Sequence, residues 1–316
     1  MVLEKVDSKR YEEKMENPYH VFASASFNEI NKDKVGEVCY LLFKDTRYRM
    51  GIIGGYGNGI FKSPFSAPFG GFSFISRDVS LIEIEEATDC LLAWARTNNI
   101  DQINITLPPF IYAESYLSKI ANIFFRKRFI NTQIDLNYHF PLSSFTDDYI
   151  KNIWRNARKN LAKALGNNLS FISCIDECSR REAYEVIKQN RESRGFPLRM
   201  TWEQVCRTSD VISADFFLVK TEENIPIAAA IVFRVSEAIV QVIYWGDIPD
   251  YAHLKTMNYL SFKVFEFYKN QNISIVDIGP STENSLPSYG LCEFKEGIGC
   301  EISTKLSFII RLANDI

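Results

Sequence analysis

A chain of 316 residues is longer than one ordinary hydrophobic core supports, so its length predicts two domains. Apolar residues make up 46% of the chain and charged residues 24%, which is typical of globular proteins and excludes a disordered or fibrous one. The formal net charge of −3 excludes a general attraction to nucleic acids or anionic membranes, so a polyanion would need a local basic patch.

The cysteines and the N-terminus bear on the cellular compartment. Seven cysteines are scattered along the chain, and Cys174 and Cys178 form the one close pair. No histidine cluster or second pair completes a zinc site, so we expect reduced thiols and no metal. The charged N-terminus lacks the apolar core of a signal peptide, and the longest apolar run, near 225–233, is too short to cross a bilayer. We therefore expect a cytoplasmic protein without a membrane span.

The first half of the chain predicts alternating strands and helices. A polar segment to about residue 18 is expected to form a short helix or an arm. Residues 38–44 and 49–56 predict two strands joined by a turn, and the glycines between 54 and 59 are expected to lie in turns. Two prolines and two glycines within 63–72 exclude a helix or a central strand and predict a shaped loop.

A helix is predicted over 80–98, because Ser80 and Glu83 have the spacing of a capping box and an apolar face follows. The rest of this half is predicted as a strand at 101–107, a helix near 115–127 and a strand near 132–140. The second half opens with a helix from about residue 146, with Thr146 as its N-cap. Further strands are predicted at 169–174, 216–222, 225–233, 239–247 and 273–278, and further helices at 180–194, 201–208 and 255–271.

The two halves repeat one order of elements. Each has paired strands, a loop with proline and glycine, an amphipathic helix, and a short strand that ends at proline. Few residues match between the halves, so the repeat is one of topology. We therefore predict an α/β protein with two domains, 1–145 and 146–316, each with a mixed sheet flanked by helices.

Three motifs carry a resemblance to a known group. They are the loop with Ser63-Pro-Phe and Pro68-Phe-Gly-Gly, the basic segment from Trp154 to Ala164, and the run from Asp277-Ile-Gly through Gly290 to Phe294-Lys and Ile298-Gly. In these the chain resembles the bacterial double-domain acyltransferases with the N-acetyltransferase-like fold, the group that includes the FemABX-type peptidyltransferases. The resemblance implies two such domains in tandem, with the active cleft mainly in the second, and transfer of an acyl or aminoacyl group to an amine.

Such a transfer needs a neutral amine, a stabilised carbonyl oxygen and a proton for the leaving group. The resemblance places the helping side chains at the ends of the strands at 239–245 and 273–278. Tyr244, Asp277 and Tyr289 are the candidate catalytic residues. The candidate substrate-binding residues are Ser281, Lys295, Arg191, Arg194, Phe69 and Trp245. For each of them a purely structural role is the alternative.

The identity of the acyl donor remains open. Acetyltransferases of this fold bind the coenzyme A pyrophosphate on a glycine-rich loop at a helix N-terminus. Here that position reads Gly246-Asp-Ile-Pro-Asp-Tyr, with one glycine, a proline and two acidic residues that repel phosphate. The co-substrate is therefore expected to be an acyl-coenzyme A held in another way, or an aminoacyl-tRNA. No covalently bound cofactor is expected.

The basic helix offers a place for such a donor. Arg155, Arg158, Lys159 and Lys163 suit the binding of a donor or another polyanion such as tRNA, and a solvated helix face is the alternative. The acceptor is expected to be an amine-bearing small molecule or a cell-wall precursor. Two rival functions stay open: a non-catalytic binding or scaffolding protein that retains the fold, and an RNA-binding module that uses the basic helix.

Overall fold

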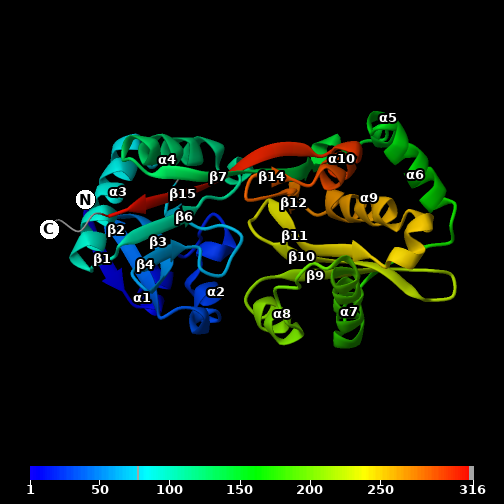
Figure 1. Ribbon diagram of the computed structural model, residues 1–316, viewed down its shortest axis with the longest axis horizontal. Helices are drawn as coiled ribbons and strands as arrows, with labels where there is room; N and C mark the ends of the chain where they lie inside the picture. The colour runs from blue at the N-terminus through cyan, green and yellow to red at the C-terminus, as the bar shows by residue number, and fades with distance from the viewer. Residues whose placement is uncertain (77, 313–316) are drawn as a thin grey trace. The chain divides into compact units, whose positions relative to one another are not determined.

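The computed structural model describes residues 1–76 and 78–312, and it divides into two compact units (Figure 1). Unit 1 consists of residues 1–136 together with the C-terminal segment from Ser303, and unit 2 consists of residues 137–302. The division at 136–137 differs from the predicted boundary at 145–146. The C-terminal segment also differs, because it belongs with the first half of the chain rather than with the second.

Unit 1 is built on a mixed sheet. Its strands follow the order β1 (Val2–Val6), β2 (Glu37–Lys44), β3 (Tyr48–Gly57), β4 (Ile60–Ser63), β6 (Gln102–Thr106) and β15 (Glu301–Arg311), and β5 (Phe72–Phe74) also pairs with β3. The β2–β3 hairpin and β6 confirm the predicted strands, whereas β1 was not predicted. Gly54, Gly55 and Gly57 lie within β3, so the turn predicted for this stretch is confined to Asn58 and Gly59.

Helices cover both faces of the unit 1 sheet. On one face α3 (Leu81–Thr97) and α4 (Glu114–Arg126) pack on Leu41 and Phe43; on the other, α1 (Ser8–Lys14) and α2 (Ala25–Glu29) pack near Tyr40 and Leu42. This explains the unbroken apolar run of β2, because successive side chains of a strand point to opposite faces. The predicted capping box of α3 is present: Glu83 N donates to Ser80 Oγ, and Ser80 N donates to the Glu83 carboxylate.

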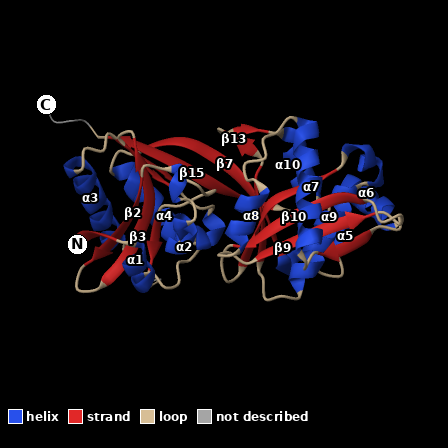
Figure 2. Ribbon diagram, turned by 90° about the horizontal axis from the view of Figure 1, so that it is seen from below, coloured by secondary structure: helices blue, strands red, loops and turns tan. Residues whose placement is uncertain are grey.

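Unit 2 is also built on a mixed set of hydrogen-bonded strands, seen from another side in Figure 2. Its strands follow the order β7 (Ile130–Pro141, here from Asn137), β12 (Ile275–Pro280), β11 (Ile239–Asp247), β10 (Pro226–Arg234), β9 (Ala214–Lys220) and β8 (Ser170–Ser173). The β11–β12 pair is parallel, and the pairs β7–β12, β10–β11, β9–β10 and β8–β9 are antiparallel. A hairpin of β13 (Thr282–Glu283) and β14 (Leu286–Pro287) follows β12.

The helices of unit 2 also lie on both faces. On one face α7 (Glu177–Arg194) and α8 (Trp202–Ser209) approach Phe216, and on the other α9 (Thr256–Lys269) packs against Phe217. α6 (Arg155–Leu165) and α10 (Tyr289–Gly297) lie beside each other, and α6 also contacts α9. The short 3-10 helices of the two units span Val21–Ala23, Lys32–Lys34, Phe110–Tyr112, Leu142–Ser144 and Pro249–Leu254 (η5).

In unit 2 one predicted helix is interrupted and one helix was not predicted. The single helix expected from residue 146 is interrupted, because Ile153 and Trp154 are extended between α5 (Tyr149–Asn152) and α6. Thr146 is therefore not its N-cap. The segment from Tyr289 to Gly297, for which no helix was predicted, is the helix α10. No helix within the described residues is long and apolar enough to span a membrane.

The predicted repeat of topology is confirmed. In unit 1 β4 leads through α3 to the parallel strand β6, and in unit 2 β11 leads through α9 to the parallel strand β12. Each sheet is then completed by a strand from the other half of the sequence. β15 pairs with β6 in unit 1, and the end of β7 pairs with β12 in unit 2.

Candidate functional site

The two central parallel strands of unit 2 separate partway along their length. β11 pairs with β12 at three positions, Ile239–Ile275, Val240–Val276 and Gln241–Asp277. β11 then continues to Asp247 without a further β12 partner among the described residues. A β-bulge at Ile243 accompanies the separation, because Val232 on β10 faces Val242 and Ile231 faces Tyr244. A bulge bends a strand and redirects its side chains, and such features are common beside active sites.

The equivalent separation in unit 1 is filled by the chain itself. β4 ends at Ser63, and the following loop turns back so that Gly70 N donates to Thr106 O of β6 over 2.8 Å. Ser63 Oγ fixes the loop by donating to Ile53 O and accepting from Gly71 N. Phe69 has no exposed surface and packs on Phe22, so this predicted substrate-binding residue lies in the core of unit 1. The open pair of strands is therefore in unit 2.

Asp277 occupies the last paired position of β12. Its side chain is fully buried, and it accepts hydrogen bonds from Asn137 Nδ2 (2.7 Å), Gln241 Nε2 (2.8 Å) and Gly279 N (2.9 Å). The carboxylate thus ties β7, β12 and β11 together where the strands part. Sequence reasoning selected Asp277 but missed Asn137, Gln241 and the neighbouring His139. The sequence held a signal for Gln241, a polar residue inside the apolar strand β11, whereas Asn137 and His139 are two of several polar residues in β7.

Lys295 on α10 caps the end of β12. Its ammonium donates to Ile278 O (2.9 Å), Gly279 O (2.8 Å) and Pro280 O (3.2 Å), and 3% of the residue is exposed. Burial lowers the pKa of Lys295 to about 8, against an opposing effect of nearby acidic groups that include Asp277. The three donors of this predicted substrate-binding residue therefore serve the chain itself.

Tyr244 follows the bulge and faces α7. The Arg191 guanidinium lies over its ring, 5.9 Å from the centroid. Burial raises the pKa of the Tyr244 hydroxyl, and the Arg191 charge opposes that rise. The Nε atom of Arg191 is buried and has no hydrogen-bond partner among the described residues. The structure thus brings together two of the predicted residues, a phenol and a guanidinium, beside the open part of β11.

The acidic residue at the end of β11 is neutralised within the chain. The Asp247 carboxylate accepts from Arg194 Nη2 (3.3 Å) and Thr256 Oγ1 (2.9 Å), and its backbone carbonyl accepts from Asn190 Nδ2 (2.7 Å). Arg194, predicted to bind substrate, therefore holds Asp247 instead. Because the Asp247 carboxylate is buried and paired, it repels phosphate less than the sequence indicated.

The other predicted residues lie nearby in unit 2. Ser281 follows β12 and is 4% exposed, and its hydroxyl lacks a hydrogen-bond partner among the described residues. Tyr289 begins α10 with 77% of its surface exposed. Trp245 points to the face opposite Tyr244, where its ring lies 6.2 Å from that of Phe294 on α10. Tyr244 and Trp245 thus flank the opening from the two sides of the sheet.

The basic helix α6 presents cations without acidic partners. Arg155, Lys159 and Lys163 are exposed, and none forms an ion pair among the described residues. Arg158 differs, because its guanidinium donates to Lys151 O and Ile153 O at the end of α5. The C-terminal end of α6 adjoins η5, where Asn167 Nδ2 donates to Leu254 O over 3.4 Å. The cations therefore lead toward the loop that follows β11.

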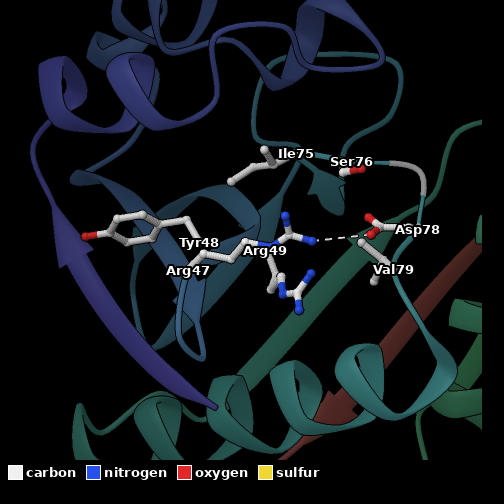
Figure 3. A pocket seen from close by; sticks show the side chains of 7 residues that line it. All are labelled: Arg47, Tyr48, Arg49, Ile75, Ser76, Asp78 and Val79. Carbon is white, nitrogen blue, oxygen red and sulfur yellow. Dashed lines mark hydrogen bonds and ion pairs between the residues drawn. The ribbon is translucent and has the colours of Figure 1, made fainter.

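A small hollow in unit 1 is lined by two arginines that already pair with acidic residues. It has a volume of about 50 Å³ and lies between Arg47, Tyr48, Arg49, Ile75, Ser76, Asp78 and Val79 (Figure 3). Arg47 pairs with Asp78 over 3.3 Å, and Arg49 pairs with Asp45 and Glu83 over 3.0 Å each. Because these guanidinium groups are already paired with acids, the hollow is a poor anion site. It includes none of the predicted site residues.

The comparisons with known proteins identify the fold. Neither a protein-family model nor a curated protein matches the sequence. Among solved structures, FemX aligns over 99% of this chain and 98% of its own, with 12% identity and a TM-score of 0.71. L-PGS from Bacillus licheniformis aligns over 99% and 94%, with 14% identity and a TM-score of 0.58.

A tandem GNAT protein from the clavulanic acid biosynthesis pathway aligns over 98% of each chain, with 9% identity and a TM-score of 0.53. These similarities extend along the whole length of the chain, and they agree with the internal repeat of topology seen in the two sheets. The chain therefore has the FemX-like fold of two acetyltransferase-like units in tandem, which confirms the predicted fold.

Proposed function

We propose that unit 2 is an N-acyltransferase that moves an acyl or aminoacyl group from an activated donor to an amine. The separation of β11 and β12 beyond Gln241 and Asp277 is the observation that carries this proposal. Backbone groups of β11 that no longer pair with β12 are suited to hold a carbonyl oxygen as negative charge develops on it. Unit 1 is not assigned this role, because its own loop occupies the equivalent place.

The reaction joins the amine nitrogen to the carbonyl carbon of the donor and breaks the bond from that carbon to the donor's oxygen or sulfur. The proton released by the nitrogen ends on the leaving group. Tyr244 is the proposed source of that proton, because its raised pKa keeps the phenol protonated near neutral pH. Asp277 is proposed to orient the amine or to take its proton, and Arg191 to bind an anionic part of a substrate.

The donor is proposed to carry phosphate groups. The unpaired cations Arg155, Lys159 and Lys163 lie along α6, and the end of this helix contacts η5 beside the opening. Phosphate backbones bind such lines of cations. An aminoacyl-tRNA and an acyl-coenzyme A both meet this requirement. One of the similar structures is a domain of a putative lysylphosphatidylglycerol synthetase, which supports an aminoacyl donor. The acceptor is proposed to be an amine-bearing small molecule or a cell-wall precursor.

The donor site is tested by reversing charges on α6. The double variant Arg155→Glu with Lys159→Glu is expected to bind fluorescent tRNA at least tenfold more weakly than the wild type in an anisotropy titration. The slope of log affinity against log salt should fall by about two, one for each lost phosphate contact. Arg181→Glu with Lys188→Glu on α7 makes the same change in net charge and is the matched control. Equal losses in the two variants would refute a site on α6.

A second candidate function is binding of RNA without catalysis, which the unpaired cations of α6 also favour. Transfer assays with alanyl-tRNA and acetyl-coenzyme A separate the two functions. Under the enzyme proposal Tyr244→Phe retains tRNA affinity and loses transfer by about a hundredfold. Salt-dependent tRNA binding by a wild-type protein that transfers from neither donor would instead support the binding module.

A further inference from the structure

A row of polar side chains crosses the sheet where β11 and β12 part. Gln241, Asp277 and His139 face one another in register across β11, β12 and β7. The preceding row, Val240, Val276 and Phe140, faces α9, because the Phe140 ring stacks on Phe265 at 3.9 Å. Since neighbouring residues of a strand point to opposite faces, the polar row lies on the face away from α9.

The polar row is buried. Gln241 is 4% exposed, Asp277 has no exposed surface and His139 is 6% exposed. Such groups require hydrogen-bond partners or a functional reason. Asp277 accepts bonds from three donors, but His139 Nδ1 and Gln241 Oε1 have no hydrogen-bond partner among the described residues. An imidazole beside a buried carboxylate, with one ring nitrogen uncommitted, is not explained by packing alone.

The other ring nitrogen of His139 faces the surface. Its Nε2 lies 3.8 Å from the carboxylate of Glu301, whose side chain is 64% exposed. Asp277 from β12 and Glu301 from β15 are the charged groups that act on His139, and both raise its pKa against the lowering effect of burial. Lys295 is the other charged group near Asp277, and its ammonium is held by three carbonyls at the end of β12.

We propose that His139 relays protons between Asp277 and solvent through Glu301 during acyl transfer. This inference rests on the proposed function. An acceptor that arrives as an ammonium must lose one proton before its nitrogen attacks the donor carbonyl. Asp277 accepts that proton and passes it to His139 Nδ1, while Nε2 gives a proton to Glu301 and then to water. No electrons are exchanged, and His139 acts through Asp277 rather than on the substrate.

Histidine is suited to this task, because its two nitrogens can exchange protons in opposite directions near neutral pH. The buried carboxylate of Asp277 has no exposed surface of its own from which to release a proton. His139 is its register partner on β7, and the imidazole lies 3.8 Å from the exposed carboxylate of Glu301. The row also explains why a histidine is buried near the end of β7.

The coupling can be measured without a substrate. The chain has three histidines, so selective ¹⁵N labelling resolves each of them by NMR, and His139→Gln assigns the His139 signal. Asp277→Asn is expected to lower the pKa of His139 by at least about half a unit, because it removes a nearby negative charge. Glu301→Gln should lower it by less, and Glu283→Gln should leave it unchanged. A His139 titration that neither Asp277→Asn nor Glu301→Gln shifts would overturn the relay.

The role in transfer is measured with acetyl-coenzyme A and alanyl-tRNA as donors. His139→Gln is expected to lower kcat about tenfold below the pKa of the acceptor amine with KM unchanged, and added imidazole should restore kcat. An active His139→Gln variant with an unaltered pH profile would contradict the relay. The NMR titration requires no donor, so its result stands even if the wild type transfers from neither. Failure of the relay and failure of the proposed function are thus distinguishable.

Discussion

Lys295 shows how a charged side chain is kept inside unit 2. Burying an ammonium is costly unless it is hydrogen-bonded, and the carbonyls of Ile278, Gly279 and Pro280 supply those bonds. The three carbonyls in turn gain a hydrogen-bond donor at the end of β12, where the chain turns at Gly279 with a φ of +70°. Lys295 therefore fixes the end of the strand beside the proposed catalytic opening.

The lowered pKa of Lys295 predicts a dependence of stability on pH. The folded value is about 8 and the ordinary value is 10.5, so between them the unfolded chain binds more protons than the folded one. The contribution of Lys295 to the free energy of unfolding should thus rise with pH from 8 to 10.5, by an amount on the order of 3 kcal/mol. Below pH 8 Lys295 is protonated in both the folded and the unfolded chain, so the free-energy cost of burying its charge does not change with pH.

Urea denaturation of the wild type and of Lys295→Met across this pH range measures the effect. Both proteins contain the same tyrosines and cysteines, so the effect of their titration on the unfolding free energy cancels in the difference. The gap in unfolding free energy should widen in favour of the wild type as the pH rises. A gap independent of pH would show that the ammonium is not desolvated in the folded protein.

At the scale of elements, the close contact between α7 and β11 determines which residue can occupy position 246, just before the loop that follows β11. A Cβ at Gly246 would lie 2.5 Å from the side chain of Asn190, which donates to Asp247 O. A glycine is therefore needed at position 246 for α7 to approach β11 this closely. From the sequence, Gly246 was considered only as the one glycine of a loop unsuited to coenzyme A, and its packing role depends on a residue 56 positions earlier.

Gly246→Ala is expected to destabilise the protein by about 1–3 kcal/mol, because the new methyl group displaces Asn190 from Asp247. Gly290→Ala is the matched control: no heavy atom lies within 4 Å of its Cβ position, and it lies within α10. Alanine there should stabilise the protein by about 0.5–1 kcal/mol. Thermal unfolding of both variants gives the comparison, and equal shifts in Tm would contradict the proposed clash.

At the scale of the whole molecule, each unit depends on a strand from the other half of the sequence. β15 follows the last helix of unit 2, yet it pairs with β6 from Ser307–Thr106 to Arg311–Gln102 and belongs to unit 1. The end of β7 follows α4 of unit 1, yet it pairs with β12 in unit 2. Neither half of the sequence therefore holds a complete sheet.

A chain that ends after Cys300 is expected to lose the structure of unit 1 before that of unit 2. The truncation removes β15, leaves β6 paired with β4 alone and deletes the core residue Phe308. Hydrogen exchange should show lost protection in β6 and α3 while β9 and β10 stay protected. Removal of residues 1–6, which deletes the edge strand β1, is the control and should have a smaller effect. Undiminished protection of β6 would refute the prediction.

Most of the helices and strands, the repeat and the fold class could be predicted from the sequence. Local features were sufficient for this: the capping box of Ser80 and Glu83, the apolar periodicity of the helices, and the prolines and glycines of the 63–72 loop. It failed where a local signal was weak, as at the extended residues Ile153 and Trp154 that divide the predicted helix.

The sequence did not show which distant strands pair or which partner each polar side chain finds, because both depend on the complete fold. Asp247 and Arg194 seemed independent in the sequence and are an ion pair in the fold. His139 was passed over, because nothing near it in the chain shows that Asp277 and Glu301 lie beside it. Pairings between distant segments depend on the register of strands, and that register is set by the packing of the complete chain rather than by neighbouring residues.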